Sequence, residues 1–221
     1  MCRTREGLLT AAALLTTSAA LILVIDRIWV TRSQQHAAGA TTEVVRWRAH
    51  GVGGTRIGSS EAPVTIVLYL DFRCAYCADQ IPVLQLVRSE FPHKITVVYQ
   101  HFLGHSSSRK AAVAAECAGR QGLFEEYGQR IFLESALSEE DRWPELAGAI
   151  DMPDVGAFVA CVNEEAVARR VDEGFEAALK LGVRGAPTYV INDRLRVGAL
   201  TTEELRSQVR LALRTWRALG R

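Results

Sequence analysis

Two runs of apolar residues predict the first strands of a sheet. Residues 64–70 read Val-Thr-Ile-Val-Leu-Tyr-Leu, and residues 95–99 read Ile-Thr-Val-Val-Tyr. β-Branched and aromatic side chains of this kind fit a pleated strand better than a helix. Two shorter strands are predicted near the C-terminus, over 188–191 and 196–198, with Asn192 and Asp193 between them as a turn.

Apolar residues recur with helical spacing through most of the remaining chain. Ser138 and Asp154 are candidate helix caps, and Thr201 with Glu204 forms a capping-box pattern before the last helix. Pro82 lies inside the first predicted helix and predicts a kink there. The predicted helices cover 78–89, 109–119, 121–134, 138–150, a short segment from 154, 164–181, and a final stretch from 202.

Residues 1–32 have a different pattern from the rest. Arg3 and Arg5 precede an uncharged run over 7–25, which spans roughly 28 Å as a helix. We interpret 1–32 as a cytoplasmic stub and an uncleaved transmembrane signal anchor. The alternative is a signal peptide cleaved near 17–19, but this would leave an apolar new N-terminus.

Polar and glycine-bearing residues 33–55 predict a flexible linker, with a short strand over 44–48 as a further possibility. The folded domain is expected over 56–221, and the predicted block of helices over about 106–181 interrupts its sheet.

Charge and cysteine content limit the function classes. The 221 residues carry a formal net charge of +1, which gives no reason to expect a nucleic-acid partner. Of the five cysteines, Cys2 precedes the predicted anchor and four follow it, where the compartment would be oxidising. Cys117 and Cys161 both lie in predicted helices, and they are either a second disulfide or two buried thiols.

The pair Cys74 and Cys77 lies where a strand passes into a helix. In this position the first sulfur meets the free N–H groups and the positive end of a helix dipole, which stabilise a thiolate. Cys74 is therefore the candidate nucleophile and Cys77 the resolving thiol, with Ala75 and Tyr76 between them. A zinc site completed by His101 and His105 is the alternative, but their spacing does not favour it.

Pro187 is the second candidate site feature, because it enters a predicted strand from the loop 183–187. It is either an ordinary proline at a strand start or a cis-proline that leaves the backbone of Ala186 free to pair with an extended peptide.

Several separate blocks resemble DsbA-like thiol–disulfide oxidoreductases of the thioredoxin superfamily. They are the segments 58–67, 71–77, 115–124 and 181–188, within a resemblance that covers about 56–219. The resemblance implies a thioredoxin fold with a helical insertion, a cis Pro187 facing Cys74, and in some members a structural disulfide between Cys117 and Cys161.

This chain departs from the family pattern at three positions. Ala75 replaces a common proline, Ala186 replaces a threonine or valine, and Leu68 replaces a buried glutamate that would assist proton transfer. Asp71 is a candidate substitute for that glutamate, and an equally good candidate for a cap on the turn.

These observations predict a membrane-anchored extracytoplasmic oxidase that donates the Cys74–Cys77 disulfide to cysteine-containing proteins and is reoxidised by a membrane redox partner. We expect it to need no cofactor and no metal. The alternatives are a disulfide reductase or isomerase, for example in cytochrome maturation, and a non-catalytic binding or chaperone module with the same fold.

Overall fold

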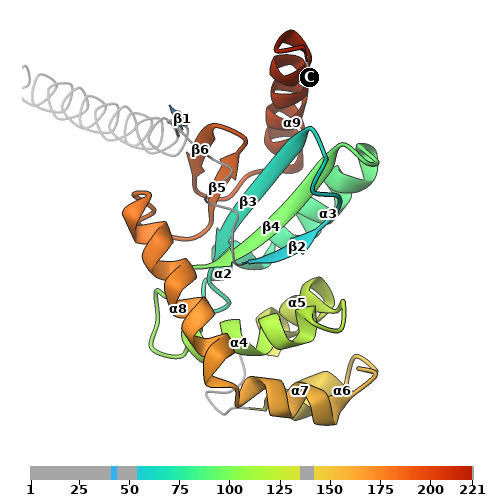
Figure 1. Cartoon of the computed structure of the whole chain (residues 1–221), viewed down its shortest axis with the longest axis vertical. Coiled ribbons are helices and arrows are strands. Elements are labelled where there is room, and N and C mark those ends of the chain that lie inside the picture. The colour runs from blue at the N-terminus through green and yellow to red at the C-terminus, as the bar shows by residue number, and fades with distance from the viewer. Residues whose placement is uncertain (1–40, 44–53, 135–141, 221) are drawn as a thin grey trace, which may run out of the picture. The chain divides into compact units, whose positions relative to one another are not determined.

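A computed structural model describes residues 41–43, 54–134 and 142–220, and the chain runs through them as a mixed α/β domain (Figure 1). The strands are β1 (Thr41–Glu43), β2 (Thr55–Ile57), β3 (Val64–Leu70), β4 (Ile95–His101), β5 (Thr188–Ile191) and β6 (Arg194–Val197). The helices are α2 (Ala75–Ala78), α3 (Gln80–Glu90), α4 (Ser108–Gly119), α5 (Phe124–Glu134), α6 (Trp143–Gly148), α7 (Val155–Val162), α8 (Glu165–Lys180) and α9 (Thr202–Ala218).

The strands form one sheet in the order β1-β6-β5-β3-β4-β2. β3 and β4 are parallel neighbours, whereas β5 runs antiparallel to β3. All seven residues of β3 and all seven of β4 are buried. Strands covered on both faces carry mostly apolar side chains on both faces, which explains why 64–70 contains no charged residue and only Thr65 as a polar one.

The two faces of β3 have separate cores. Ile66 and Leu68 belong to the larger core, which includes side chains of α3 and α9. Val67 and Tyr69 belong to a smaller core on the other face, which includes Ala178 of α8. The sheet is thus sandwiched between helices, as the alternation of side chains along a strand requires.

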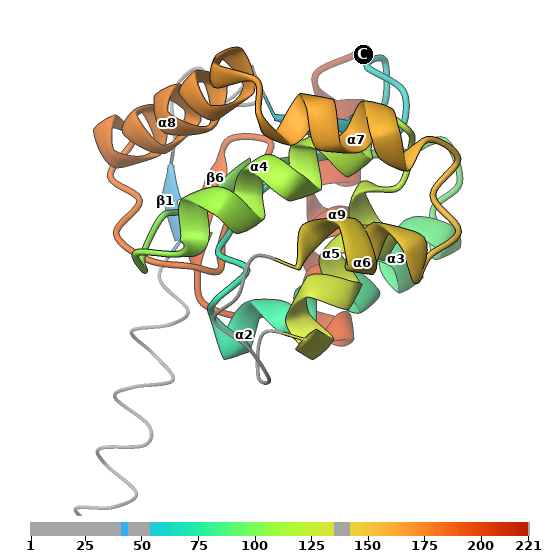
Figure 2. The same cartoon turned by 90° about the horizontal axis from the view of Figure 1, so that it is seen from below.

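The helices α4 to α8 form the insertion between β4 and β5, and α4 packs against α5, α7 and α8 (Figure 2). A disulfide joins Cys117 of α4 to Cys161 of α7, with 5.7 Å between their Cα atoms.

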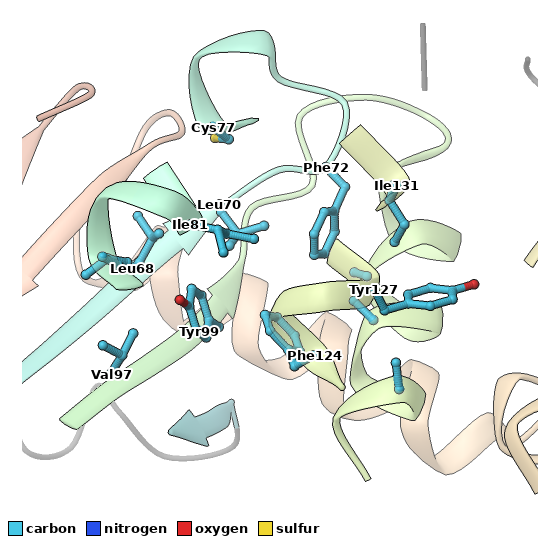
Figure 3. Close-up of a cluster of buried hydrophobic side chains, with 14 of the residues drawn as sticks. Leu68, Leu70, Phe72, Cys77, Ile81, Val97, Tyr99, Phe124, Tyr127 and Ile131 are labelled. Atoms are coloured by element: carbon cyan, nitrogen blue, oxygen red, sulfur yellow. The ribbon is translucent and has the colours of Figure 1, made fainter. Parts of the chain in front are cut away.

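Aromatic residues join the insertion to the sheet. Figure 3 shows Phe72, at the end of β3, next to Phe124 and Ile131 of α5. The ring centroids of Phe72 and Phe124 are 6.1 Å apart, and Phe124 stacks on Tyr99 of β4 at 4.8 Å. This shared core fixes the insertion relative to the end of β3, where the CxxC motif begins.

A partly buried ion pair reinforces the same junction. Arg88 of α3 makes two hydrogen bonds to the Glu125 carboxylate of α5, at 2.7 and 2.8 Å, and the Tyr99 hydroxyl donates a third at 2.6 Å. Burial opposes ionisation of Glu125, but the hydrogen bonds from Arg88 and Tyr99 outweigh it and lower the pKa of the carboxyl group. Three elements are therefore held together by one charged carboxylate.

The thioredoxin-like α/β fold is confirmed, and so are most of the predicted elements. The strand over 64–70 has the predicted bounds, and the predicted caps Asp154 and Thr201 both accept the expected backbone hydrogen bonds. Thr201 and Glu204 complete the predicted capping box.

The predicted helix 78–89 with a kink at Pro82 is wrong in detail. The structure has a short helix α2 that starts directly after Cys74, and a break at Asp79 before α3 begins. Pro82 lies in the first turn of α3, where a missing N–H breaks no intrahelical hydrogen bond.

Part of the predicted linker 33–55 belongs to the sheet, because β1 pairs with β6 and β2 starts at Thr55. The predicted anchor 1–32, the strand 44–48 and the cap Ser138 lie outside the described residues. In the described part of the chain, no helix is both long and apolar enough to cross a membrane.

The Cys117–Cys161 disulfide closes a loop with a sequence separation of 44 residues. We expect the double variant Cys117→Ser/Cys161→Ser to lose about 4 kcal/mol of unfolding free energy, the chain-entropy value for such a loop. Denaturant unfolding in oxidising buffer measures this loss. The double variant Cys74→Ser/Cys77→Ser is the matched control, and an equal loss in both double variants would contradict the structural role of the disulfide.

Candidate active site

The CxxC motif lies in a tight turn between β3 and α2. The Cys74 amide donates to the Asp71 carbonyl, and the Cys77 amide donates to the Cys74 carbonyl, each at 3.0 Å. Cys74 is the N-cap residue of α2, with extended backbone angles, and Cys77 lies in the helix. The strand-to-helix geometry expected from the sequence is therefore present.

The two thiols have different environments. Cys74 is half-buried and both of its neighbours in the motif, Ala75 and Tyr76, are exposed, whereas Cys77 is fully buried. Both cysteines are free thiols in this structure. Burial raises the pKa of the Cys77 thiol strongly, the hydrogen bond from the Asp71 amide partly offsets this, and the charges of Cys74 and Asp71 add to the rise.

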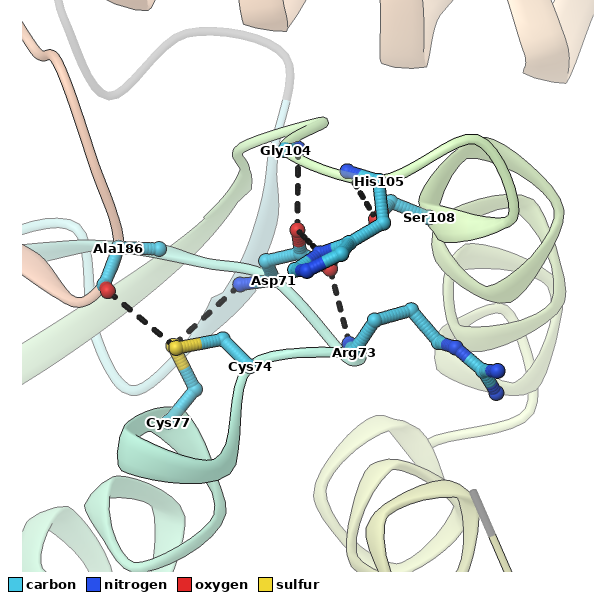
Figure 4. A network of polar contacts seen from close by, with 8 residues as sticks. All are labelled: Asp71, Arg73, Cys74, Cys77, Gly104, His105, Ser108 and Ala186. Carbon is cyan, nitrogen blue, oxygen red and sulfur yellow. Dashed lines mark hydrogen bonds and ion pairs between the residues drawn. The ribbon is translucent and has the colours of Figure 1, made fainter. Parts of the chain in front are cut away.

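The sulfur atoms contact two backbone groups from different segments (Figure 4). Cys74 Sγ lies 3.4 Å from the carbonyl oxygen of Ala186, to which the thiol donates. The Asp71 amide donates to Cys77 Sγ at 3.5 Å. The structure thus brings Cys74, Cys77 and the loop before β5 together, as the sequence predicted.

The peptide bond between Ala186 and Pro187 is cis. The loop is held by hydrogen bonds from the Thr188 hydroxyl to the Gly185 carbonyl at 2.7 Å and from the Gly198 amide to the Pro187 carbonyl at 2.9 Å. Among the described residues, none accepts a hydrogen bond from the Ala186 amide. The Ala186 carbonyl contacts Cys74, and the Tyr76 side chain, two residues after Cys74, is exposed.

Asp71 has a larger role than the sequence indicated. Its carboxylate is buried and accepts four hydrogen bonds, from the Arg73 amide at 2.8 Å, the Gly104 amide at 3.0 Å, His105 Nδ1 at 3.1 Å and the Ser108 hydroxyl at 2.7 Å. The bond to Arg73 caps the turn, which was one of the two predicted roles. The other three bonds reach the loop after β4 and the start of α4.

The position of the family's buried glutamate is apolar in this chain. Leu68 is completely buried, and its neighbour across the sheet is Tyr189. The Tyr189 hydroxyl donates to Gln80 Oε1 at 2.6 Å, and burial raises the pKa of Tyr189 above its ordinary value. The polar pair Gln80–Tyr189 was missed from the sequence, because both residues occupy positions with ordinary helix and strand spacing.

The two histidines of the alternative zinc site do not join the cysteines. His101 Nε2 lies 2.8 Å from Glu116 Oε1, inside the core, whereas His105 contacts Asp71. No group of three or more potential metal ligands is found in the described segments.

Comparison with known proteins identifies the family. The family model described as thioredoxin matches residues 51–210. A thioredoxin-like oxidoreductase from Silicibacter pomeroyi DSS-3 has 23% identity and a TM-score of 0.65, over 77% of this chain and 99% of its own. BdbD from Bacillus subtilis has 18% identity and a TM-score of 0.65, over 80% and 98%. ScsC from Proteus mirabilis has 18% identity and a TM-score of 0.66, over 97% and 98%.

The curated proteins with similar sequences are named as Na(+)/H(+) antiporters. A Na(+)/H(+) antiporter NhaA 1 from Salinispora arenicola is 33% identical over 158 residues, which are 69% of this chain and 24% of the antiporter. A Na(+)/H(+) antiporter NhaA from Herminiimonas arsenicoxydans is 30% identical over 137 residues, which are 62% of this chain and 22% of the antiporter. This chain therefore spans about a quarter of the length of these relatives.

The chain belongs to the thioredoxin family. The family match confirms the thioredoxin superfamily predicted from the sequence, and the free thiols Cys74 and Cys77 lie within the matched residues.

The unequal burial of the two thiols predicts selective alkylation. We expect iodoacetamide to modify Cys74 of the reduced native protein and to leave Cys77 at least tenfold less modified, since the thiolate is the reactive form. Because the pKa of Cys77 is raised, its thiolate stays scarce up to about pH 9, and the selectivity should persist there. Peptide mass mapping measures both sites, and the denatured protein, in which both react, is the control. Equal modification of the native thiols would contradict the assignment.

Proposed function

We propose that this protein is a membrane-anchored extracytoplasmic oxidase that donates the Cys74–Cys77 disulfide to folding proteins. The observation that carries the proposal is the position of Cys74 Sγ, half-exposed and 3.4 Å from the Ala186 carbonyl, while Cys77 is fully buried behind it. A substrate cysteine can reach the first sulfur and is shielded from the second.

In the proposed reaction a substrate thiolate attacks Cys74 Sγ. A disulfide forms between substrate and Cys74, the Cys74–Cys77 bond breaks, and Cys77 Sγ takes the electron pair and then a proton. A second substrate thiolate then attacks the substrate sulfur of the mixed disulfide and releases Cys74. The substrate loses two electrons and two protons, and the protein gains them.

The substrate groove is proposed at Ala75, Tyr76, Ala186 and Pro187. The Ala186 amide would pair with the backbone of a cysteine-containing segment, and the exposed Tyr76 ring would cover its apolar side chains. Because the Ala186 side chain is small, the proposed contact is made mainly by its backbone. Backbone contacts do not distinguish substrate side chains, so we expect the protein to accept many different substrates.

The Cys117–Cys161 disulfide supports an extracytoplasmic location, because structural disulfides persist in oxidising compartments. The proposed location is the bacterial periplasm or the outer face of the cytoplasmic membrane, with residues 1–32 as the anchor. A membrane redox partner would return the reduced pair to the disulfide.

Serine variants test the roles of the two cysteines. We expect Cys77→Ser to accumulate mixed disulfides with proteins that contain a disulfide, because the Cys74 thiolate attacks that disulfide, one substrate sulfur leaves as a thiolate, and no Cys77 thiol is present to release Cys74. We expect Cys74→Ser to form none and to lose oxidase activity at least a hundredfold. Non-reducing gels followed by mass spectrometry detect the mixed disulfides.

The direction of the reaction is tested by measuring the reduction potential of the Cys74–Cys77 pair and by trapping its thiols in cells. A potential near that of thioredoxin, about −270 mV, with a dithiol in cells would overturn the oxidase assignment and favour the reductase or isomerase.

Carbonate extraction of cell membranes tests the proposed anchor. We expect the full-length protein to stay in the membrane pellet and a variant lacking residues 1–32, exported by a cleavable signal sequence, to be soluble, because about 20 apolar residues suffice to span a bilayer. Release of the full-length protein by carbonate would contradict the anchor and leave the thiol chemistry unaffected.

A further inference from the structure

A chain of two contacts connects the solvent to the buried sulfur of the active site. The side chain of His105 is 57% exposed, and its Nδ1 lies 3.1 Å from Asp71 Oδ2. The side chain of Asp71 is 2% exposed, and the amide of the same residue donates to Cys77 Sγ at 3.5 Å. An exposed imidazole is thus two contacts away from a fully buried thiol (Figure 4).

His105 differs from the other partners of the Asp71 carboxylate. The Arg73 amide, the Gly104 amide and the Ser108 hydroxyl are neutral donors at every physiological pH. Histidine is the side chain that changes charge between pH 5 and 8. Three neutral donors therefore hold the Asp71 carboxylate in place. The fourth partner, His105, neutralises the carboxylate charge when its ring is protonated.

The charge of Asp71 acts on Cys77 when the disulfide is opened. A thiolate that attacks Cys74 Sγ forms a new S–S bond, and the electron pair of the broken bond goes to Cys77 Sγ. The proton that Cys77 later takes up balances the one that the attacking thiol lost. Negative charge then develops on Cys77. The Asp71 carboxylate is a like charge that raises the pKa of this thiol, less than burial and Cys74 do, so it opposes the departure of the sulfur.

We propose that His105 is a positioning residue of this redox centre, whose protonated ring neutralises the Asp71 carboxylate and thereby eases the departure of the Cys77 sulfur. Asp71 transmits the effect as a fixed charge, and its carboxylate is not the base that takes the proton. The inference rests on the proposed roles of Cys74 and Cys77, but it holds for either direction of electron flow.

Other charged or titratable groups face the same region. Arg73 stays cationic at all relevant pH values, and Asp79 is exposed after the end of α2. Tyr189 is a neutral phenol, because burial raises its pKa. His101 is 3% exposed, and its Nε2 is directed at Glu116. His101 is the second histidine of this region, so the test must separate it from His105.

The test measures the rate at which dithiothreitol reduces the Cys74–Cys77 disulfide of the full-length protein. Rates are expressed per dithiothreitol thiolate at about pH 5.5 and about pH 8, on either side of the histidine charge change. We expect His105→Gln, which keeps a hydrogen-bond donor and loses the charge, to react about three- to tenfold more slowly than the native protein at the lower pH. At the higher pH the two rates should agree within about twofold, since both side chains are then neutral.

Two further variants separate charge from structure. Ser108→Ala removes a neutral donor from the same carboxylate, so its rate relative to the native protein should be the same at both pH values. Asp71→Asn removes the negative charge, so it should be about three- to tenfold faster than the native protein at about pH 8. In the Asp71→Asn background, His105→Gln should have no further effect, whereas any effect of His101 would remain.

An equal effect of His105→Gln at both pH values, or an undiminished effect in the Asp71→Asn background, would overturn the inference. Neither result depends on whether the protein is an oxidase. If Cys74→Ser instead retained oxidase activity, the proposed function would fail irrespective of the rates measured with His105→Gln.

Discussion

The buried carboxylate of Asp71 is the constraint on which the active site depends. A charge that is removed from water must be compensated by hydrogen bonds, because its desolvation costs several kcal/mol. Asp71 obtains these bonds from the turn before α2, from the loop after β4 and from the first residue of α4. The position of the CxxC motif relative to the helical insertion is therefore determined by the need to satisfy one side chain.

The same residue links the polar network to the thiols. Its backbone amide points at Cys77 Sγ, while its carboxylate points away toward Gly104 and His105 (Figure 4). Because Phe72 follows directly and packs on Phe124 and Phe132, the turn cannot shift without disturbing the core that joins the sheet to the insertion. Rigid support of this kind keeps the Cys74 sulfur facing the Ala186 carbonyl.

Elements with an uninterrupted or strictly periodic pattern could be predicted from the sequence. The strand 64–70 and the helix after Thr201 are examples, because burial on defined faces determines their residue types. The break at Asp79 was not predictable, since the apolar spacing continues through it and the helix starts earlier, at the CxxC motif itself. β1 was missed because a three-residue edge strand is specified by its partner β6 and not by its own residues.

The residues of the candidate site also divide into those with a local sequence motif and those without one. Cys74, Cys77 and Pro187 could be found because their local motifs carry the chemistry. Three of the four partners of the Asp71 carboxylate are instead more than thirty positions away and have no pattern of their own. Both roles considered for Asp71 were plausible from its position alone. Three-dimensional contacts favour the cap, because all four donors are directed at the carboxylate oxygens and leave little capacity to accept a proton from a thiol.

The role of Asp71 matters because this chain has Leu68 at the position where the family commonly has a buried glutamate. A carboxylate at that position would lie in the sheet beside Tyr189 and would exchange protons with the resolving thiol from within the core. With leucine there, the buried side of Cys77 offers apolar contacts and the neutral Gln80–Tyr189 pair. The carboxylate of Asp71, directly after the end of β3, also raises the pKa of Cys77, and it contacts the exposed His105. The ionisable network next to Cys77 therefore lies at the end of β3 and not within the sheet, and His105 is its solvent-exposed member.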